Sequence, residues 1–545
     1  MKKLVSRFMA VLMAMTMILS MSMTAFAAED ATRLTGTGKL TVNNTVAGKT
    51  LDLYQIFTAT KNEAGNVAYT LNPEYNGFFQ NKISGASTLT GEALSEKAYA
   101  YVQKQVGTDG SNGAAFAKDI LRWILNNATT VAATHTTETT TAGSTVISDL
   151  AYGYYVVYPL GATDTSAAPG TGQDYTSVAS LVSVTSTDAT VNMKSNYPTV
   201  VKKVNDNKNA DDVNIGDTVT YTLTSKVPDM TGYTSYVFNF KDTLSEGLTF
   251  KEITSVKVGE TTITKVDAGQ EADNTYTLTQ DGQNITITMN NFLASNKDKA
   301  GQEIKVTYTA TVNKNAVTGF DANKNSATVE YSNKPGTDNK GESEPSIVDV
   351  HTFNFTIFKY YLKDETKTGL ANAEFELYKA NEAGDAADTN AKINIVKVKD
   401  GEYRQATPEE ATAEGFKSDV IVSGTNGKVL VQGLDAGTYY LRETKAPEGY
   451  NKLLSDIKVE IKANYDETTG KLTSYSVDYT YNGTTTPGTA ITNKDSSPEV
   501  AVENKTGAQL PSTGSKGALM VTLAGIVLFG ALTASKAFGK KKAKN

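Results

Sequence analysis

The chain has 545 residues, a net charge of −7 and no cysteine, which excludes a disulfide framework, the usual reinforcement of exported proteins. Its two histidines, His135 and His351, leave little basis for a histidine-based catalytic or metal site, so we expect no metal and no cofactor. No basic cluster occurs in the region that would remain after export, which argues against a nucleic-acid partner.

The first 27 residues predict an export signal. Positive charge within the first seven residues precedes an apolar run from Phe8 to Met23, and Ala25-Phe26-Ala27 has the small-x-small pattern of a signal-peptidase site. A retained membrane anchor is the alternative, which the short run and the cleavage pattern disfavour. We therefore expect cleavage after Ala27 and leave residues 1–27 out of the fold.

The segment from 28 to 195 mixes both kinds of secondary structure. Alternating apolar residues predict four strands, at 39–42, 51–57, 154–158 and 179–184. Between them, apolar residues spaced by three and four, flanked by glycine-rich breaks, predict helices at 93–106 and 114–125. This pattern predicts a β-domain with helical insertions.

Two further segments, 196–350 and 351–507, are dominated by strand patterns. Period-two alternation is clearest at 218–223, 283–289, 304–312, 353–357 and 500–502. Turns rich in Gly, Asn and Asp separate these runs, as in β-sandwiches. The predicted fold class is therefore mainly β, with three β-sandwich domains in series.

Two lysines lie in phase with apolar strand residues that should face a core. Lys359 continues the alternating apolar series of 353–357, because alternate residues of a strand share one face. Lys202 lies between Val200 and Val204 in the same way. A buried ammonium without a partner is costly, so burial should drive both side chains toward the neutral amine, which is a nucleophile.

An acid and an amide in the last segment complete a reactive set with Lys359. Glu443 is in phase with Leu441, so it should also point inward, where loss of water favours the protonated acid. Asn504 is in phase with Val502 and aims at the same interior. The neutral amine can attack the asparagine carbonyl while the acid polarises it and moves protons, so that an amide bond forms and ammonia leaves.

The stretch 439–450, YYLRETKAPEGY, resembles the YxLxETxAPxGY "E-box" of Gram-positive backbone pilins. In that family, Cna-B-like domains carry autocatalytic Lys–Asn isopeptide bonds. The resemblance implies Ig-like or Cna-type β-sandwiches here, with Lys359 as the amine, Glu443 as the catalytic acid and Asn504 as the amide. Asn493 is the alternative amide; Asn504 is preferred because the family's closing strand lies a few residues before its wall-sorting motif.

The stretch 237–250 resembles another element of that family, the DTLxxGLxF strand and turn in which the aspartate is the acid. By this resemblance Asp242 is the acid, Asn325 is the amide on the closing strand, and Lys202 is the amine. Lys203 is the alternative amine if the register slips by one residue. The competing interpretation places these side chains on the surface.

The C-terminal segment, 508–545, has three parts. Leu510-Pro511-Ser512-Thr513-Gly514 is followed by an apolar stretch at 517–534, long enough to cross a bilayer as a helix, and then by a basic tail. This order resembles the LPxTG sorting signal read by sortases. By that resemblance a sortase cuts between Thr513 and Gly514 and transfers the Thr513 carbonyl to an amine, which ends a transient retention in the membrane.

Polymerisation of such pilins needs an acceptor lysine, often within a VYPK motif at the end of the first domain. Val191-Asn192-Met193-Lys194 occupies that place, so the resemblance implies that Lys194 is joined to Thr513 of the next subunit. Asn192-Met193 replaces Tyr-Pro, which leaves other exposed lysines nearby as alternatives. No acid–lysine–asparagine set stands out in the first domain, and we expect no internal bond there.

These patterns predict a secreted, wall-anchored structural protein, the backbone subunit of a sortase-assembled pilus that supports adhesion. We do not expect it to be an enzyme, apart from the autocatalytic formation of its own internal bonds. The implied partners are pilus-type and housekeeping sortases, identical subunits in a covalent head-to-tail polymer, minor pilins and peptidoglycan, with a host surface ligand left open. A non-polymerising adhesin or minor pilin is the alternative. A wall-anchored hydrolase is disfavoured, because no paired acids or histidine triad stand out.

Overall fold

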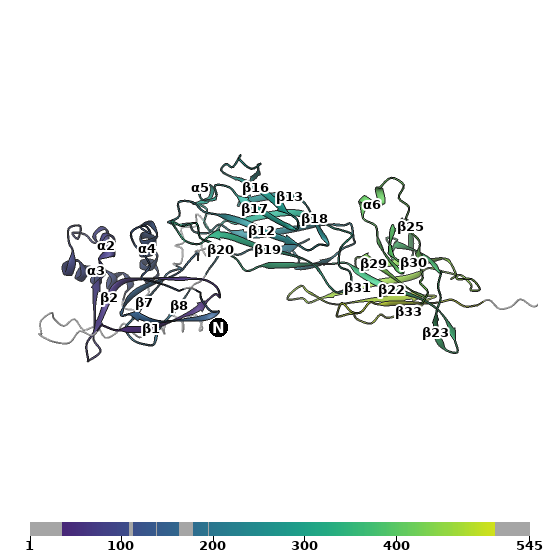
Figure 1. Cartoon of the computed structure of the whole chain (residues 1–545), viewed down its shortest axis with the longest axis horizontal. Coiled ribbons are helices and arrows are strands. Elements are labelled where there is room, and N and C mark those ends of the chain that lie inside the picture. The colour runs from purple at the N-terminus through teal and green to yellow at the C-terminus, as the bar shows by residue number, and fades with distance from the viewer. Residues whose placement is uncertain are drawn as a thin grey trace, which may run out of the picture. The chain divides into compact units, whose positions relative to one another are not determined.

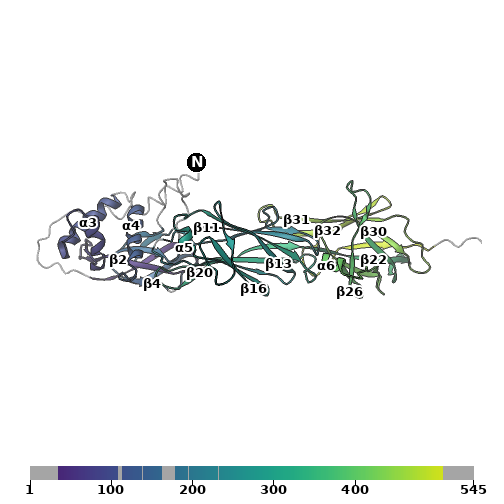
Figure 2. The same cartoon turned by 90° about the horizontal axis from the view of Figure 1, so that it is seen from above.

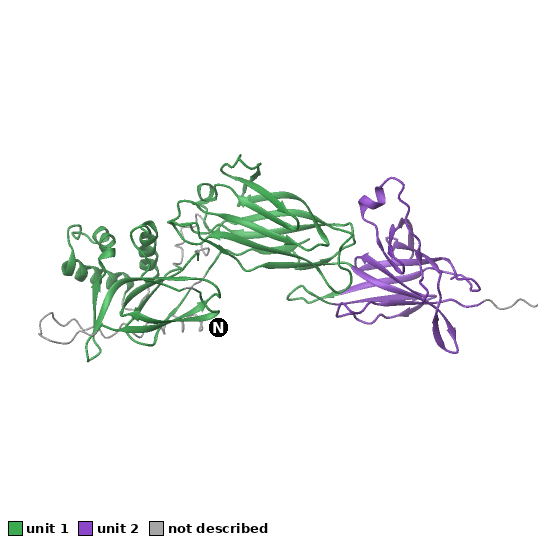
Figure 3. Ribbon diagram, viewed as in Figure 1, with its two compact units in different colours: residues 1–352, 464–473 green, residues 353–463, 474–545 purple. Residues whose placement is uncertain are grey.

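The computed structural model describes residues 35–107, 113–137, 139–162, 178–193, 196–230 and 232–506. The predicted signal peptide, Lys194 and the C-terminal segment with Leu510, Pro511, Thr513 and Gly514 lie outside these residues. The chain divides into two compact units, residues 1–352 with 464–473 and residues 353–463 with 474–545 (Figure 3). The first unit contains two sets of sheets with separate cores, so we describe a first module (35–193), a second module (196–352) and a third module (353–506).

The first module has three layers, and its middle sheet is covered on both faces. One apolar cluster lies between the middle sheet and a three-stranded sheet. Another lies between the opposite face of the middle sheet and the helices. The central strand β2 is therefore buried along nearly its whole length. Figure 1 shows the helices gathered on one side of the strands. The helices are η1 (Pro73–Tyr75), α2 (Asn76–Lys82), α3 (Gly91–Val106) and α4 (Gly113–Asn126).

The strand order of the three-stranded sheet is β5 (Gly143–Ala151), β1 (Thr37–Thr45) and β8 (Ala189–Asn192). The order of the middle sheet is β3 (Val67–Leu71), β2 (Leu51–Lys61), β6 (Gly153–Pro159) and β7 (Ser180–Val184), with β4 (His135–Thr136) beside β2. The two helices predicted from periodicity differ from α3 and α4 by at most two residues at their ends.

The second module is a sandwich of two sheets whose facing apolar side chains form one core. Its strands lie roughly along one axis in both views, with most neighbours antiparallel (Figures 1 and 2). The smaller sheet has the order β14 (Thr261–Thr262), β13 (Leu248–Val258), β18 (Glu303–Val312), β11 (Thr218–Lys226) and β9 (Val201–Val204). The larger has the order β10 (Ala210–Asp212), β21 (Ser346–His351), β19 (Asn323–Ser332), β12 (Phe238–Leu244), β17 (Asn284–Met289), β16 (Thr275–Asp281) and β15 (Thr264–Lys265), with β20 (Lys340–Glu342) beside β19. A short helix, α5 (Phe292–Asn296), follows β17.

The third module also has two sheets. One has the order β23 (Thr366–Gly369), β22 (Phe353–Lys363), β29 (Lys428–Leu434), β27 (Glu402–Gln405) and β26 (Ile395–Lys399), with β34 (Glu499–Glu503) beside β22. The other has the order β25 (Ala387–Lys392), β24 (Glu374–Ala380), β30 (Gly437–Lys445), β31 (Ile457–Tyr465), β32 (Leu472–Tyr481) and β33 (Thr484–Thr486), with β28 (Ile421–Val422) beside β24. A short helix, α6 (Pro408–Thr412), follows β27.

The mainly β fold class is confirmed, with helices inserted in the first module. Two details differ from the sequence expectation. Residues 464–473 group with the first unit, whereas the sequence placed them inside the segment 351–507. The strand β19 that carries Asn325 is not the closing strand of its module, because β21 follows it and pairs with it antiparallel. Within the described residues no helix is long and apolar enough to cross a bilayer, and the stretch 517–534 lies outside them.

Candidate cross-linking sites

The second module buries all three of the residues that its sequence singled out. Lys202, Asp242 and Asn325 expose 1%, 2% and 0% of their surface. Lys202 lies on β9 of the smaller sheet, whereas Asp242 and Asn325 lie on adjacent strands, β12 and β19, of the larger sheet. Alternation places Lys202 on the core side because Val200 and Val204 are buried with it. The set therefore spans the interior between the two sheets.

The hydroxyl of Tyr308 connects these three side chains. Lys202 Nζ contacts Asp242 Oδ2 directly and donates a hydrogen bond to Tyr308 Oη at 2.7 Å. Tyr308 Oη donates to Asp242 Oδ2 at 2.8 Å, and Asn325 Nδ2 donates to Tyr308 Oη at 2.7 Å. Asp242 Oδ1 and Asn325 Oδ1 are buried without a hydrogen-bond partner among the described residues. The amine, the acid and the amide thus meet at one hydroxyl.

Burial sets the protonation tendencies of this group. Desolvation lowers the pKa of Lys202 from 10.5 to about 8, although the neighbouring Asp242 carboxylate acts in the opposite direction. Desolvation also raises the pKa of Asp242, against the influence of the Lys202 amine and the Tyr308 hydroxyl. Both changes favour the uncharged pair, a neutral amine beside a protonated acid. The aromatic rings of Tyr221 and Tyr308 lie 4.8 Å and 5.0 Å from Lys202 Nζ and complete its surroundings.

The third module buries its set in a different arrangement. Lys359, Glu443 and Asn504 expose 0%, 2% and 2% of their surface. Lys359 lies on β22, and Asn504 follows directly after β34, the strand that pairs with β22 in parallel and places Val502 opposite Lys359. Glu443 lies on β30 of the other sheet and points across the interior. Here the amine and the amide come from neighbouring strands, and only the acid comes from the opposite sheet.

In this site the acid contacts the other two groups directly. Lys359 Nζ lies 3.0 Å from Glu443 Oε1, without hydrogen-bond geometry, and Asn504 Nδ2 donates to Glu443 Oε2 at 3.3 Å. Backbone groups hold the remaining contacts: Leu453 N–H donates to Glu443 Oε2 at 2.7 Å, and Asn504 Nδ2 donates to the Asn451 carbonyl at 2.6 Å. Desolvation lowers the pKa of Lys359 to about 8, partly offset by the Glu443 carboxylate.

A glycine allows the chain to pass close to Lys359. The φ of Gly427 is +78°, in the left-handed region that favours glycine, and a Cβ at this position would lie 2.3 Å from the Lys359 carbonyl oxygen. The Lys359 N–H donates to the Gly427 carbonyl at 2.8 Å. The backbone of β22 is thereby fixed at the residue that presents the amine.

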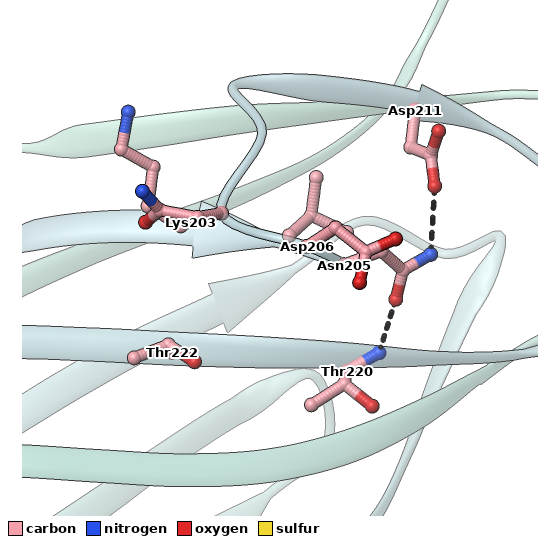
Figure 4. Close-up of a pocket in the computed structure, with 8 residues that line it drawn as sticks. Lys203, Asn205, Asp206, Asp211, Thr220 and Thr222 are labelled. Carbon is pink, nitrogen blue, oxygen red and sulfur yellow. Dashed lines mark hydrogen bonds between the residues drawn. The ribbon is translucent and has the colours of Figure 1, made fainter.

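The alternative residues lie outside these interiors. Lys203 is the next residue after Lys202, so it faces the other side of β9, where it donates to Asn209 Oδ1 at 2.6 Å and lines an open surface hollow. Figure 4 shows Lys203 in this hollow, with the Asn205 side chain hydrogen-bonded to Asp211 and to the Thr220 backbone. Asn493 is exposed, and its Oδ1 accepts from the Asp495 N–H. The geometry therefore favours Lys202 and Asn504.

Sequence reasoning missed the groups that surround the predicted residues. Tyr308 carried a usable signal, because it alternates in phase with the buried residues Val306 and Ala310 of β18. The Asn451 carbonyl and the Leu453 N–H come from a loop without periodicity, so no sequence pattern marks them.

The predicted assembly residues lie outside the described residues; they are Lys194, Leu510, Pro511, Thr513 and Gly514. Within the described part of the chain, no three His, Asp or Glu side chains are grouped to hold a metal ion.

Each buried set has the groups needed to form an amide bond between lysine and asparagine. A neutral amine is a nucleophile, a protonated acid can polarise the amide carbonyl and donate a proton, and ammonia is the leaving group. Loss of water lowers the pKa of both lysines, which favours the neutral amine in each interior, and it removes a competing nucleophile. Within the described residues, nothing else buries a lysine with an acid and an asparagine in contact with one another.

Comparison with known families matches parts of the second and third modules to known kinds of domain. Residues 215–335 match the family described as Gram-positive pilin backbone subunit 2, Cna-B-like domain, and residues 356–475 match the SpaA prealbumin-like fold domain. The chain carries pilin domains. Asp242 and Asn325 lie inside the first match, and Lys359 and Glu443 inside the second.

Curated relatives are pilus and surface proteins. The chain is 28% identical over 349 residues to the fimbrial subunit type 2 of Actinomyces naeslundii, a match that covers 60% of this chain and 58% of the relative. It is 26% identical over 321 residues to the trypsin-resistant surface T6 protein of Streptococcus pyogenes, covering 53% of this chain and 50% of the relative. The matched region thus spans about half the length of these curated relatives.

Solved structures of major pilins are similar at low identity. The T6 backbone pilin of Streptococcus pyogenes is 18% identical, with a TM-score of 0.44, and the match covers 90% of this chain and 100% of that one. The major pilin SpaA of Corynebacterium diphtheriae is 17% identical, with a TM-score of 0.41, and the match covers 86% of this chain and 99% of that one.

Proposed function

We propose that this chain is the repeating backbone subunit of a covalent pilus on a Gram-positive cell surface, stiffened by two internal Lys–Asn isopeptide bonds. The observation that supports the proposal most strongly is the pair of buried sets, Lys202–Asp242–Asn325 and Lys359–Glu443–Asn504, in modules that match pilin domains. The fimbrial and surface names of the curated relatives agree with it.

The energetics of the two interiors favour the bonded form. A fully buried ion pair that leaves carboxylate and amide oxygens without partners is costly, and Asp242 Oδ1, Asn325 Oδ1 and Asn504 Oδ1 are all in that position. Condensation converts the lysine amine into a neutral amide, so that no ammonium remains buried beside the acid. A cross-link that closes a loop of about 120 to 145 residues also removes about 4–5 kcal/mol of unfolded-state entropy.

In each site the reaction conserves atoms and charge. The neutral lysine nitrogen bonds to the asparagine Cγ, the Cγ–Nδ2 bond breaks, and ammonia leaves with a proton supplied through the acid. The acid regains a proton from the lysine nitrogen and ends as it began. Asp242 serves the second module, and Glu443 serves the third.

The same proposal assigns the assembly chemistry to segments outside the described residues. A pilus-type sortase would cut between Thr513 and Gly514 of the LPSTG motif, of which Leu510 and Pro511 are the recognition residues, and would join Thr513 to Lys194 of the next subunit. A housekeeping sortase would attach the finished polymer to peptidoglycan, and minor pilins would be its accessory subunits. These roles rest on the sequence motifs and on resemblance to the pilin family.

A blot of cell-wall extracts tests polymerisation. Wild-type chain should run as a ladder of high-molecular-weight species in denaturing gels, and Lys194→Arg, which keeps the charge but removes the acceptor amine, should reduce the ladder to monomer. Lys97→Arg, on the exposed side of α3, is the matched control and should leave the ladder intact. A wild-type monomer band without a ladder would replace the backbone role by that of a non-polymerising adhesin or minor pilin.

A further inference from the structure

Tyr308 uses every hydrogen-bonding position of its hydroxyl on the three reactive groups of the second module. A tyrosine hydroxyl has one proton to donate and two lone pairs that accept. The proton goes to Asp242 Oδ2, and the lone pairs accept from Lys202 Nζ and from Asn325 Nδ2. A tyrosine that only filled space in the core would have no reason to contact all three groups.

The sheet register shows how a third group can lie between Asp242 and Asn325. Asp242 pairs with Ala327 across β12 and β19, so Asn325 is its diagonal neighbour on the next strand. Diagonal neighbours on adjacent strands are about 7–8 Å apart. In this site the Asn325 Nδ2 donates to Tyr308 Oη and not to Asp242. Tyr308 enters from β18 of the facing sheet and occupies the space between them.

The surroundings hold the Tyr308 ring and keep its hydroxyl protonated. Tyr308 is fully buried, its ring stacks on Tyr221 with centroids 5.2 Å apart, and Phe250 lies 5.8 Å away. Burial, reinforced by the Asp242 charge, raises the pKa of Tyr308 well above its ordinary value. The hydroxyl therefore retains a proton that it can pass on as it receives another.

We propose that Tyr308 is a catalytic residue of the second-module site, where its hydroxyl carries a proton from Asp242 to the departing amide nitrogen of Asn325. This role deepens the proposed function and rests on it. Lys202 Nζ bonds to Asn325 Cγ, Tyr308 Oη gives its proton to Nδ2, and ammonia leaves as the Cγ–Nδ2 bond breaks. Once Cγ is attacked, Nδ2 gains a lone pair that accepts a proton, so the Tyr308 hydroxyl turns its proton from Asp242 Oδ2 to Nδ2 and accepts the Asp242 carboxyl proton in its place. The proton released by Lys202 Nζ returns to Asp242.

The third module needs no such residue. Asn504 Nδ2 contacts Glu443 Oε2 itself, at 3.3 Å, so the acid can protonate the leaving nitrogen directly. The third-module bond is therefore an internal control within the same chain, since loss of the Tyr308 hydroxyl should leave it unaffected.

The test compares Tyr308→Phe with Tyr276→Phe in a recombinant chain of residues 28–509, made by cell-free translation and sampled over time. Tyr276 is a buried tyrosine of the same module whose hydroxyl contacts none of the reactive groups. Intact mass and tryptic peptides report each bond separately. General acid catalysis typically contributes about 10²–10⁴ in rate. Tyr308→Phe should therefore form the second-module bond about a hundredfold more slowly, and Tyr276→Phe at the parent rate.

Site-specific 3-fluorotyrosine at position 308 separates proton transfer from packing. It keeps the ring in place and makes the hydroxyl more acidic, so the relay requires a changed rate in the second module alone, whereas a packing role predicts no change. This substitution also serves if Tyr308→Phe does not fold.

Second-module bond formation at the parent rate in Tyr308→Phe would overturn the role of Tyr308, and so would an equal delay of both bonds. A parent chain that lacks the second-module bond would instead contradict the proposed function, and the role of Tyr308 with it.

Discussion

The second and third modules hold the same kinds of reactive group on differently arranged strands. In the second, Lys202 and Asn325 come from opposite sheets, so a bond between them would join the two layers of the sandwich. In the third, Lys359 and Asn504 come from neighbouring parallel strands of one sheet, and the acid reaches them from the other. Similar chemistry is thus compatible with two strand topologies, provided that a proton path connects the acid to the amide.

The position of each bond along the chain also differs. Asn504 follows the last strand of the third module, so a bond to Lys359 on the first strand would leave almost no chain free to extend. Asn325 is followed by the rest of β19 and by β20 and β21, which are held by hydrogen bonds, ion pairs and core packing but would have no covalent cross-link. Tension would bypass nearly all of the third module, but only part of the second.

The largest effect should appear when single molecules are pulled from their ends. With the bond in place, release of the segment after Asn325 lengthens the stretched molecule by at most about 9 nm. This segment has about 25 residues, and an extended residue spans about 3.3–3.6 Å. Lys202→Ala should expose the whole second module and add about 50 nm. Lys203→Ala, which changes the outward-facing neighbour, is the control and should behave as the parent. If the second module of Lys202→Ala also lengthens by only about 9 nm, Lys202 does not limit its extension, and the proposed difference between the two modules is wrong.

A smaller effect should follow removal of one acid. Glu443→Ala should leave the third-module amine unreacted and lower the stability of that module by about 4–5 kcal/mol, the entropy contribution of the lost cross-link, with a further cost from the unpaired amine. Calorimetry on Glu443→Ala and on the exposed-site control Glu499→Ala measures this difference. An unchanged third-module transition in Glu443→Ala would remove Glu443 from the reaction.

The smallest effect concerns pH. In Asn325→Ala the Lys202 amine stays free, with a pKa of about 8 in the folded chain and 10.5 as its ordinary value. Because the folded pKa is the lower one, the unfolded chain binds more protons between these values, and stability should rise with pH from about 8 to 10.5. The expected gain is on the order of 3 kcal/mol. The bonded parent has no amine there, so the difference in urea midpoint between the two proteins should shrink over this range; a constant difference would contradict the depressed pKa.

Much of this arrangement could be predicted from sequence, and the limits are physical. Period-two alternation placed Lys359, Glu443 and Lys202 on core-facing sides, because one buried face fixes the phase of a strand. The same rule predicts that Tyr308 faces the core. It does not predict that Tyr308 contacts Asp242, because that contact depends on how the two sheets pack against each other. Local pattern likewise did not predict that β21 closes the second module.

The most direct test of the central claim is the intact mass of a purified recombinant chain of residues 28–509. Each Lys–Asn bond expels one ammonia, so two bonds should make the protein about 34 Da lighter than its sequence mass, about 17 Da for each module. Tryptic fragments should contain Lys202 linked to Asn325 and Lys359 linked to Asn504. A mass equal to that of the sequence, with all four residues in linear peptides, would contradict the account.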